Sequence, residues 1–104
     1  MLDERIRNEQ IDELAKAILT IESQEEAYRL FEDLFTIKEL QAVAQRLAVA
    51  QLLKKKVTYQ DIAEKTGAST ATISRVNRSL TYGAGGYQLV LSRLGENVSS
   101  ADEE

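Results

Sequence analysis

The chain of 104 residues contains no cysteine, no histidine and no proline. Without cysteine it has neither a disulfide framework nor a zinc–thiolate site, and without histidine it lacks the commonest general base and metal ligand. An enzyme is difficult to build from the remaining side chains, so we expect a protein that is not an enzyme and needs no cofactor. Proline interrupts helices, and its absence suits a chain made mainly of helices.

Long apolar segments are missing as well. The sequence has no run of about 18 apolar residues and no signal-like N-terminus, so we expect a soluble, cytoplasmic protein with no membrane partner. A chain of 104 residues with 43% hydrophobic content corresponds to one domain, whose core is small for a monomer. Self-association is therefore expected.

The net charge of −4 is divided unevenly along the chain. Residues 1–37 carry −6, residues 38–94 carry +6 and residues 95–104 carry −4. A basic segment of this kind attracts phosphates, while the acidic segments keep the molecule soluble and limit indiscriminate binding. The alternative is that the charges simply fall on solvated faces.

The basic segment contains a pattern typical of a helix-turn-helix, over residues 59–80. Gly67 lies where the turn needs positive φ, which glycine adopts without a Cβ clash. The hydroxyl of Ser69 is predicted to cap the second helix, as Thr58 with Asp61 is for the first. The residues expected to face the core at helical spacing are Ile62, Ala63, Ile73, Val76 and Leu80. This geometry leaves the second helix free to enter a DNA major groove, although an αα-hairpin that only packs would have a similar pattern.

The outward side of this motif is short and polar where the second helix begins, and basic further along. Short hydroxyl and methyl groups allow close approach to base edges, and arginines bond to guanine or phosphate. The lysine run at 54–56 suits both a helix end and a phosphate contact, although such a run is often only a solvated end. The residues predicted to contact DNA are Tyr59, Gln60, Ser69, Thr70, Ala71, Ser74, Arg75, Arg78, Lys54, Lys55 and Lys56.

The segments before the motif are also predicted to be helical, which gives an all-α fold of about six helices. A first helix is expected from about residue 3 to residue 19. Ser23 with Glu26 has the spacing of a capping box that opens a second helix. Thr36 with Glu39 repeats this spacing and opens a third helix that ends near Lys54.

After the motif, the segment YGAGGY at 82–87 is predicted to be a turn rather than an anion-binding nest of backbone N–H groups. A final helix is expected from Tyr87 to about Leu94. The single domain is then predicted to span residues 1–95, with a disordered acidic tail at 96–104.

The stretch from Thr36 to Leu80 resembles the Trp repressor family, and residues 1–95 as a whole are similar to its YerC/YecD branch. The segments that carry the likeness are Thr36, AQRLAVAQLL with Arg46, the run from Gly67 to Arg75, Asn77, Ser79, Leu80 and the YGAGGY loop. The resemblance implies an intertwined, all-helical homodimer whose two helix-turn-helix units read successive major grooves of a palindromic operator. It also implies transcriptional repression.

The resemblance further implies a site for an amino-acid co-repressor. Arg46 and Arg75 match the two arginines that flank such a ligand, while Thr36, Thr72 and Ser79 match other groups around it. Guanidinium planes can stack on a ring and pair with a carboxylate. Val76, however, stands where the tryptophan-binding members have glycine, and its side chain would fill space that the indole needs. A smaller amino acid, another metabolite and no effector at all stay open.

Three classes of function agree with these features. The leading one is a dimeric, sequence-specific repressor of transcription. A second is a protein-interaction module built on the same scaffold, whose binding would be insensitive to salt, unlike a DNA contact. The third, part of a nucleic-acid enzyme, would need an acidic metal site. The N-terminal acids that would form one are better explained as a solvated helix face, and they are Asp3, Glu4, Glu9, Asp12 and Glu13.

Overall fold

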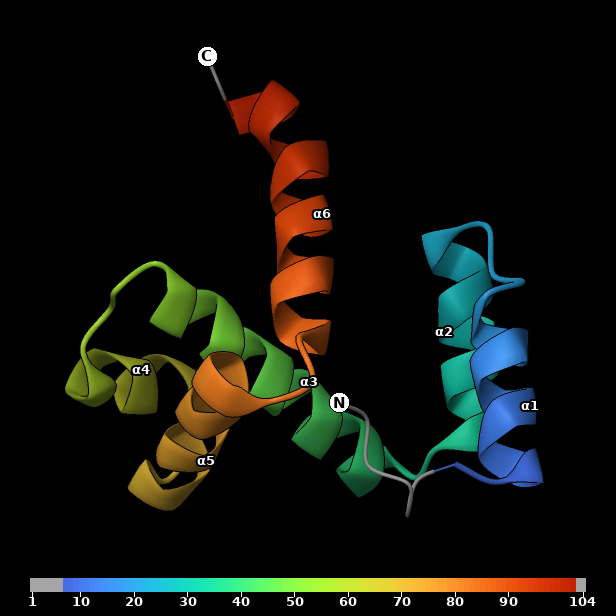
Figure 1. Cartoon of the computed structure of the whole chain (residues 1–104), viewed down its shortest axis with the longest axis horizontal. Helices are drawn as coiled ribbons and strands as arrows, with labels where there is room; N and C mark the ends of the chain where they lie inside the picture. The colour runs from blue at the N-terminus through green and yellow to red at the C-terminus, as the bar shows by residue number, and fades with distance from the viewer. Residues whose placement is uncertain (1–6, 103–104) are drawn as a thin grey trace. The chain divides into compact units, whose positions relative to one another are not determined.

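A computed structural model describes residues 7–102, and it describes the side chains of residues 7–95. The described chain forms six α-helices and no strand (Figure 1), which confirms the predicted all-α class. Within that range, no helix is both long and apolar enough to cross a membrane. The chain divides into two compact units, residues 1–40 and 41–104. The helices are α1 (Glu9–Ile18), α2 (Gln24–Leu34), α3 (Ile37–Lys54), α4 (Tyr59–Thr66), α5 (Thr70–Tyr82) and α6 (Gly86–Asp102).

In the first unit, α1 begins later than the apolar spacing predicts. The side chain of Asn8 accepts a hydrogen bond from the backbone N–H of Ile11 (2.8 Å), and Asn8 itself is extended. An asparagine in this position caps a helix and stops it from extending backward. The helix therefore starts at Glu9 instead of near residue 3, and residues 3–6 of the prediction lie outside the described residues.

The two predicted caps at the next helix starts are present. The hydroxyl of Ser23 accepts from Glu26 N–H (3.1 Å), although the Glu26 carboxylate accepts from the preceding Glu22 N–H (2.9 Å) instead of from Ser23. Thr36 and Glu39 form the complete reciprocal pair, with bonds of 3.1 and 2.9 Å. These caps fix where α2 and α3 begin because they satisfy N–H groups that have no partner within the helix.

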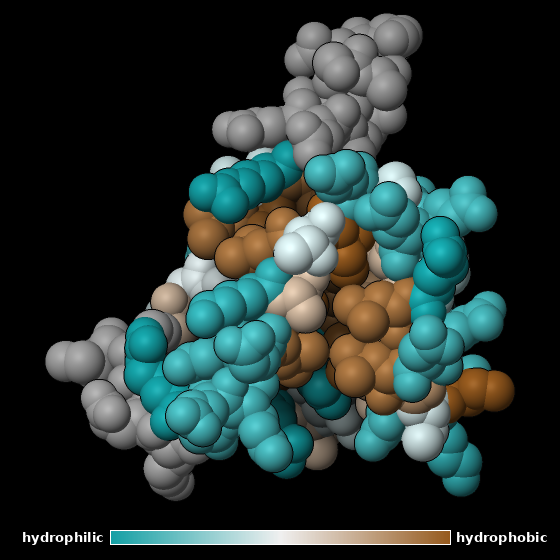
Figure 2. All heavy atoms as spheres, turned by 90° about the vertical axis from the view of Figure 1, so that its right-hand side faces the viewer, coloured by the Kyte–Doolittle hydropathy of each residue, from teal (hydrophilic) through white to brown (hydrophobic). Residues whose placement is uncertain are grey.

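Among the described residues of the first unit (7–40), apolar side chains are present but none is buried. No residue of α1 or α2 is buried. Phe31 and Phe35 make an edge-to-face contact with ring centroids 5.9 Å apart. Figure 2 shows apolar residues, in brown, open at the surface of the molecule. The large exposed apolar residues of this unit are Ile11, Leu14, Ile18, Leu19, Tyr28, Leu34 and Ile37.

The second unit holds the core. Its buried residues come from the later part of α3, from α4, α5 and α6, and from the turn between α4 and α5, and they are Val49, Ala50, Ile62, Ala68, Ile73, Val76 and Leu91. Ile62, Ile73 and Val76 are fully or almost fully buried, as their spacing predicts, and Leu80 and Ala63 are partly buried against them. The inward face of the predicted motif is thus confirmed.

The end of α3 is closed by a residue with unusual backbone conformation. Lys56 has φ of 66°. Its N–H donates to the Leu53 carbonyl (3.0 Å), and Val57 N–H donates to the Leu52 carbonyl (3.1 Å). These two bonds form a Schellman motif, whose left-handed position glycine usually occupies. A side chain in this conformation costs about 1 kcal/mol.

The last helix differs from the prediction, which ends it near Leu94. α6 runs from Gly86 to Asp102 and passes through Gly95. A single glycine inside a helix costs only about 1 kcal/mol relative to alanine, and no proline follows to remove a backbone hydrogen bond. Residues 96–102, assigned by the sequence to a disordered tail, are therefore helical in backbone.

Candidate nucleic-acid interface

The helix-turn-helix is built from two capped helices and one glycine. Thr58 Oγ1 accepts from Asp61 N–H (3.2 Å) at the start of α4, and Ser69 Oγ accepts from Thr72 N–H (3.1 Å) at the start of α5. Gly67 ends α4 with φ of 76°, and its N–H donates to the Ala63 carbonyl (2.8 Å). All three predicted features of the turn are confirmed.

A network of hydrogen bonds that the sequence reasoning missed holds this turn. The hydroxyl of Thr66 donates to the Ile62 carbonyl (2.7 Å) and accepts from Ala68 N–H (3.1 Å). Gln45, on α3, donates through its side-chain nitrogen to the Thr66 carbonyl (3.1 Å). A threonine immediately before the turn glycine was an available local signal, whereas Gln45 lies too far away in sequence to be recognised. The turn is thus tied to α3 as well as to its own helices.

The exposed side of α5 carries the predicted base-reading residues. Thr70, Ala71 and Ser74 are exposed near its start, and Arg75 and Arg78 are exposed further along. On the opposite side, Ile73 and Val76 are 0% and 2% exposed. The helix is therefore divided into one face that packs and one that is open to a ligand.

The other predicted DNA contacts are also at the surface. Tyr59 and Gln60 open α4, Ser69 caps α5, and Lys54, Lys55 and Lys56 lie where α3 ends. Among residues 7–95, whose side chains the structure describes, the only ion pair joins Lys16 to Glu13 (3.4 Å). The basic side chains of the second unit therefore form no ion pair with a carboxylate of residues 7–95, which leaves them available to phosphate.

The residues matched to an effector site are spread over both units. Arg46 on α3 and Arg75 and Ser79 on α5 are exposed, while Thr72 is half-buried and its hydroxyl lies 3.1 Å from that of Ser69. Thr36 belongs to the first unit, where its hydroxyl caps α3. Val76 is part of the core that joins α3 and α5.

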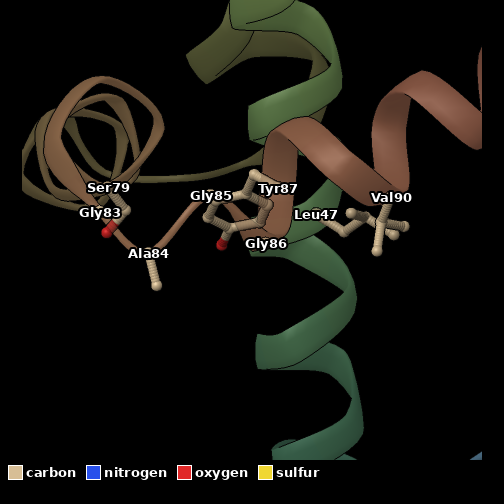
Figure 3. Close-up of a pocket in the computed structure, with 8 residues that line it drawn as sticks. All are labelled: Leu47, Ser79, Gly83, Ala84, Gly85, Gly86, Tyr87 and Val90. Carbon is tan, nitrogen blue, oxygen red and sulfur yellow. The ribbon is translucent and has the colours of Figure 1, made fainter. Parts of the chain in front are cut away.

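A separate open pocket of about 460 Å³ lies where α5 passes into α6. Figure 3 shows Ser79 and Gly83 at the left end of the loop of residues 83–85, with Tyr87, Leu47 and Val90 toward its right. The predicted turn over 82–87 is shorter in the structure, because Tyr82 ends α5, Gly86 begins α6, and only residues 83–85 join the two helices. Gly83 N–H donates to the Ser79 carbonyl (2.8 Å), and a Cβ on Gly83 would collide with that same oxygen. Gly85 has φ of 89°.

A capped turn that presents one polar and basic helix on a small helical core defines a helix-turn-helix protein of the nucleic-acid-binding class. The sequence model of the family described as Trp repressor protein matches residues 9–95. The chain therefore belongs to the Trp repressor family, a family of DNA-binding transcription regulators, and the resemblance noted in its sequence is confirmed.

Individual relatives agree with this assignment. The chain is 45% identical over 101 residues to the uncharacterized protein YerC of Bacillus subtilis, and the match covers 97% of each sequence. It is also similar to the crystal structure of a TrpR-like protein from Eubacterium eligens, with a TM-score of 0.85, 52% identity, and coverage of 89% of this chain and 96% of that one. A protein from Staphylococcus aureus proposed to be a Trp repressor gives a TM-score of 0.84 and 49% identity, with coverage of 90% and 94%.

Proposed function

We propose that this protein is a cytoplasmic, non-enzymatic regulator that binds double-stranded DNA in a sequence-specific manner and represses transcription from a palindromic operator. The observation that carries the proposal is the division of α5 into a buried apolar face and an exposed face. The exposed face bears short polar groups at its start and Arg75 and Arg78 beyond them. Short groups suit base edges and the T methyl, and the arginines suit guanine or phosphate.

The homodimer is part of this proposal. In support of it, α1 and α2 bury no residue although each carries apolar side chains at helical spacing. Ile11, Leu14 and Ile18 share one face of α1 and are 39–49% exposed. A second copy that covers such faces would supply a core that the described residues of this unit do not form alone, and a two-fold axis would bring two α5 helices to a palindromic site.

For the effector, we propose that the protein does not use tryptophan. Val76 is 2% exposed and packs in the core with α3 residues Val49 and Ala50. A ring that entered between α3 and α5 would have to displace this side chain. Arg46 and Arg75, exposed on those same two helices, remain suited to the carboxylate of a smaller amino acid or metabolite, or to DNA phosphates.

A second candidate function is a protein-interaction module without an effector. It is favoured by the apolar residues exposed around the junction of α5 and α6, where Tyr82 is 83% exposed and Leu89 and Val90 are about half exposed. A protein partner would bury such residues, and its binding would change little with salt.

Selection of bound sequences from a random duplex library, with purified protein at two salt concentrations and with and without an amino-acid pool, separates these functions. A repressor of the proposed kind enriches a palindrome with half-sites about one helical turn apart. A variant with both Arg75 and Arg78 changed to Ala serves as the matched control and should enrich nothing. Failure of the wild-type protein to enrich any sequence would favour the interaction module.

A further inference from the structure

Among the described residues, one residue with a left-handed backbone conformation is not a glycine. Gly67 and Gly85 have positive φ, and so does Lys56. At all three positions a glycine would meet the backbone requirement without strain. Position 56 therefore carries a long side chain although its backbone conformation favours glycine, which has no side chain.

Local contacts do not account for this lysine. The two Schellman hydrogen bonds at the end of α3 are donated by the backbone N–H groups of Lys56 and Val57. A glycine at position 56 has the same backbone N–H and would make the first of these bonds equally well. The side chain of Lys56 is exposed, and among residues 7–95, whose side chains the structure describes, the only ion pair lies elsewhere, between Lys16 and Glu13. What glycine would remove is the positive charge.

The positive charge of Lys56 lies immediately before the helix-turn-helix in the chain. Thr58, which caps α4, follows Lys56 by two residues, and the apolar Val57 between them is packed against the core. The turn is thus anchored on one side while Lys56 and its neighbours Lys54 and Lys55 are exposed. A phosphate held by this turn would fix the start of α4 on the duplex, and α4 leads through Gly67 directly to α5.

We propose that Lys56 is a positioning residue that binds a DNA backbone phosphate. Its left-handed conformation lowers the stability of the fold, and the lysine is retained at this position because of the phosphate contact. The inference rests on the proposed DNA-binding function and specifies how the motif is held in register. Lysine acts as a point charge toward phosphate and carries no sequence information. Backbone strain of this kind concentrates where function requires a particular side chain.

The test compares Lys56→Gly, Lys56→Asn and Lys56→Arg with the wild type, with Lys38→Gln as the control for removal of one exposed charge. Binding to a labelled duplex of mixed sequence is measured across a salt series, together with the melting temperature. The Gly and Asn variants should bind about fivefold more weakly at low salt, with the slope of log K against log salt reduced by about one. The Arg variant should keep affinity and slope. The Gly variant should melt about 3 °C higher, because the strain is relieved.

The outcomes distinguish this inference from the function on which it rests. If the wild type binds duplex DNA and Lys56→Gly matches it in affinity and slope, the inference fails while the proposed function stands. An equal loss in Lys38→Gln would also overturn it, because net charge alone would then explain the effect. If the wild type binds no duplex at all, the proposed function fails and the inference fails with it.

Discussion

The side-chain nitrogen of Gln45 on α3 donates a hydrogen bond of 3.1 Å to the backbone carbonyl of Thr66, the last residue of α4. The carbonyl is one of the four at a helix end that have no partner within the helix. A side chain of α3 therefore donates the hydrogen bond that this carbonyl lacks within α4. The bond holds the turn between α4 and α5, the two helices of the DNA-binding motif, against α3.

Replacing Gln45 with Ala should lower the free energy of unfolding by about 1 kcal/mol, because a part-buried carbonyl loses its partner. Affinity for DNA should fall as well, since the turn that orients α5 is less restrained. Chemical denaturation and DNA titration measure the two effects. Gln41→Ala, an exposed glutamine one turn earlier on the same helix, should change neither, and equal effects in both variants would refute the role of this bond.

Gly67→Ala should destabilise the protein by about 1 kcal/mol. A Cβ at this position would have Gln45 Nε2 as its nearest neighbour at 3.9 Å, an ordinary contact, so the cost comes from φ of +76° and not from crowding. Gly86→Ala is the matched control, because its φ is not in the left-handed region and nothing lies within 4 Å of the added Cβ. That variant should be neutral or slightly stabilised in thermal denaturation. A loss of similar size in the two variants would contradict the backbone explanation.

Arg78→Ala should weaken binding to all DNA sequences and reduce the salt slope by about one if the guanidinium contacts phosphate. Arg93→Ala, on α6 and also exposed, removes the same charge away from the motif and should leave the slope unchanged. Binding is measured by fluorescence anisotropy over a salt series. An unchanged slope for Arg78→Ala would exclude a phosphate contact at this residue.

Thr70→Ala or Ser74→Ala should instead change the preferred base at one operator position, at a cost of about 1–3 kcal/mol for the original base. Repeating the sequence selection with each variant reveals the changed position. Weaker binding to every sequence by the same factor would mean that these hydroxyls do not read bases.

Leu14→Asp should prevent self-association, because it places a charge on the exposed apolar face of α1 that we propose to be covered by a second copy. Sedimentation equilibrium should give the mass of a monomer or a shift of the equilibrium toward it. Lys16→Glu alters charge on the same helix without removing apolar surface and should leave the association unchanged. A wild-type protein that is monomeric at all concentrations would end the dimer proposal.

The sequence predicted most of what depends on neighbours along the chain. Caps at Ser23, Thr36, Thr58 and Ser69 and the turn at Gly67 follow from bonds that span three or four residues, so their patterns were readable. Gln45 was missed because its partner lies 21 residues away. The extension of α6 through Gly95 was missed because a glycine permits a helix end without requiring one.

The same distinction applies to the predicted interface. The face of α5 that packs was predictable from Ile73 and Val76 at helical spacing, and the exposed face followed from it. The left-handed conformation of Lys56 was not predictable from the sequence, because lysine has no local preference for positive φ. It depends on Leu52 and Val57, which pack against the core on either side of the turn.

Val76 has a consequence for the energetics of recognition. Its side chain belongs to the same core as Val49 and Ala50 of α3, so the tilt of α5 is set during folding. A helix that is already oriented loses little conformational entropy on docking, and the free energy of binding is not reduced by the cost of reorienting it. We therefore expect α5 to have the same orientation before and after the folded chain contacts its ligand.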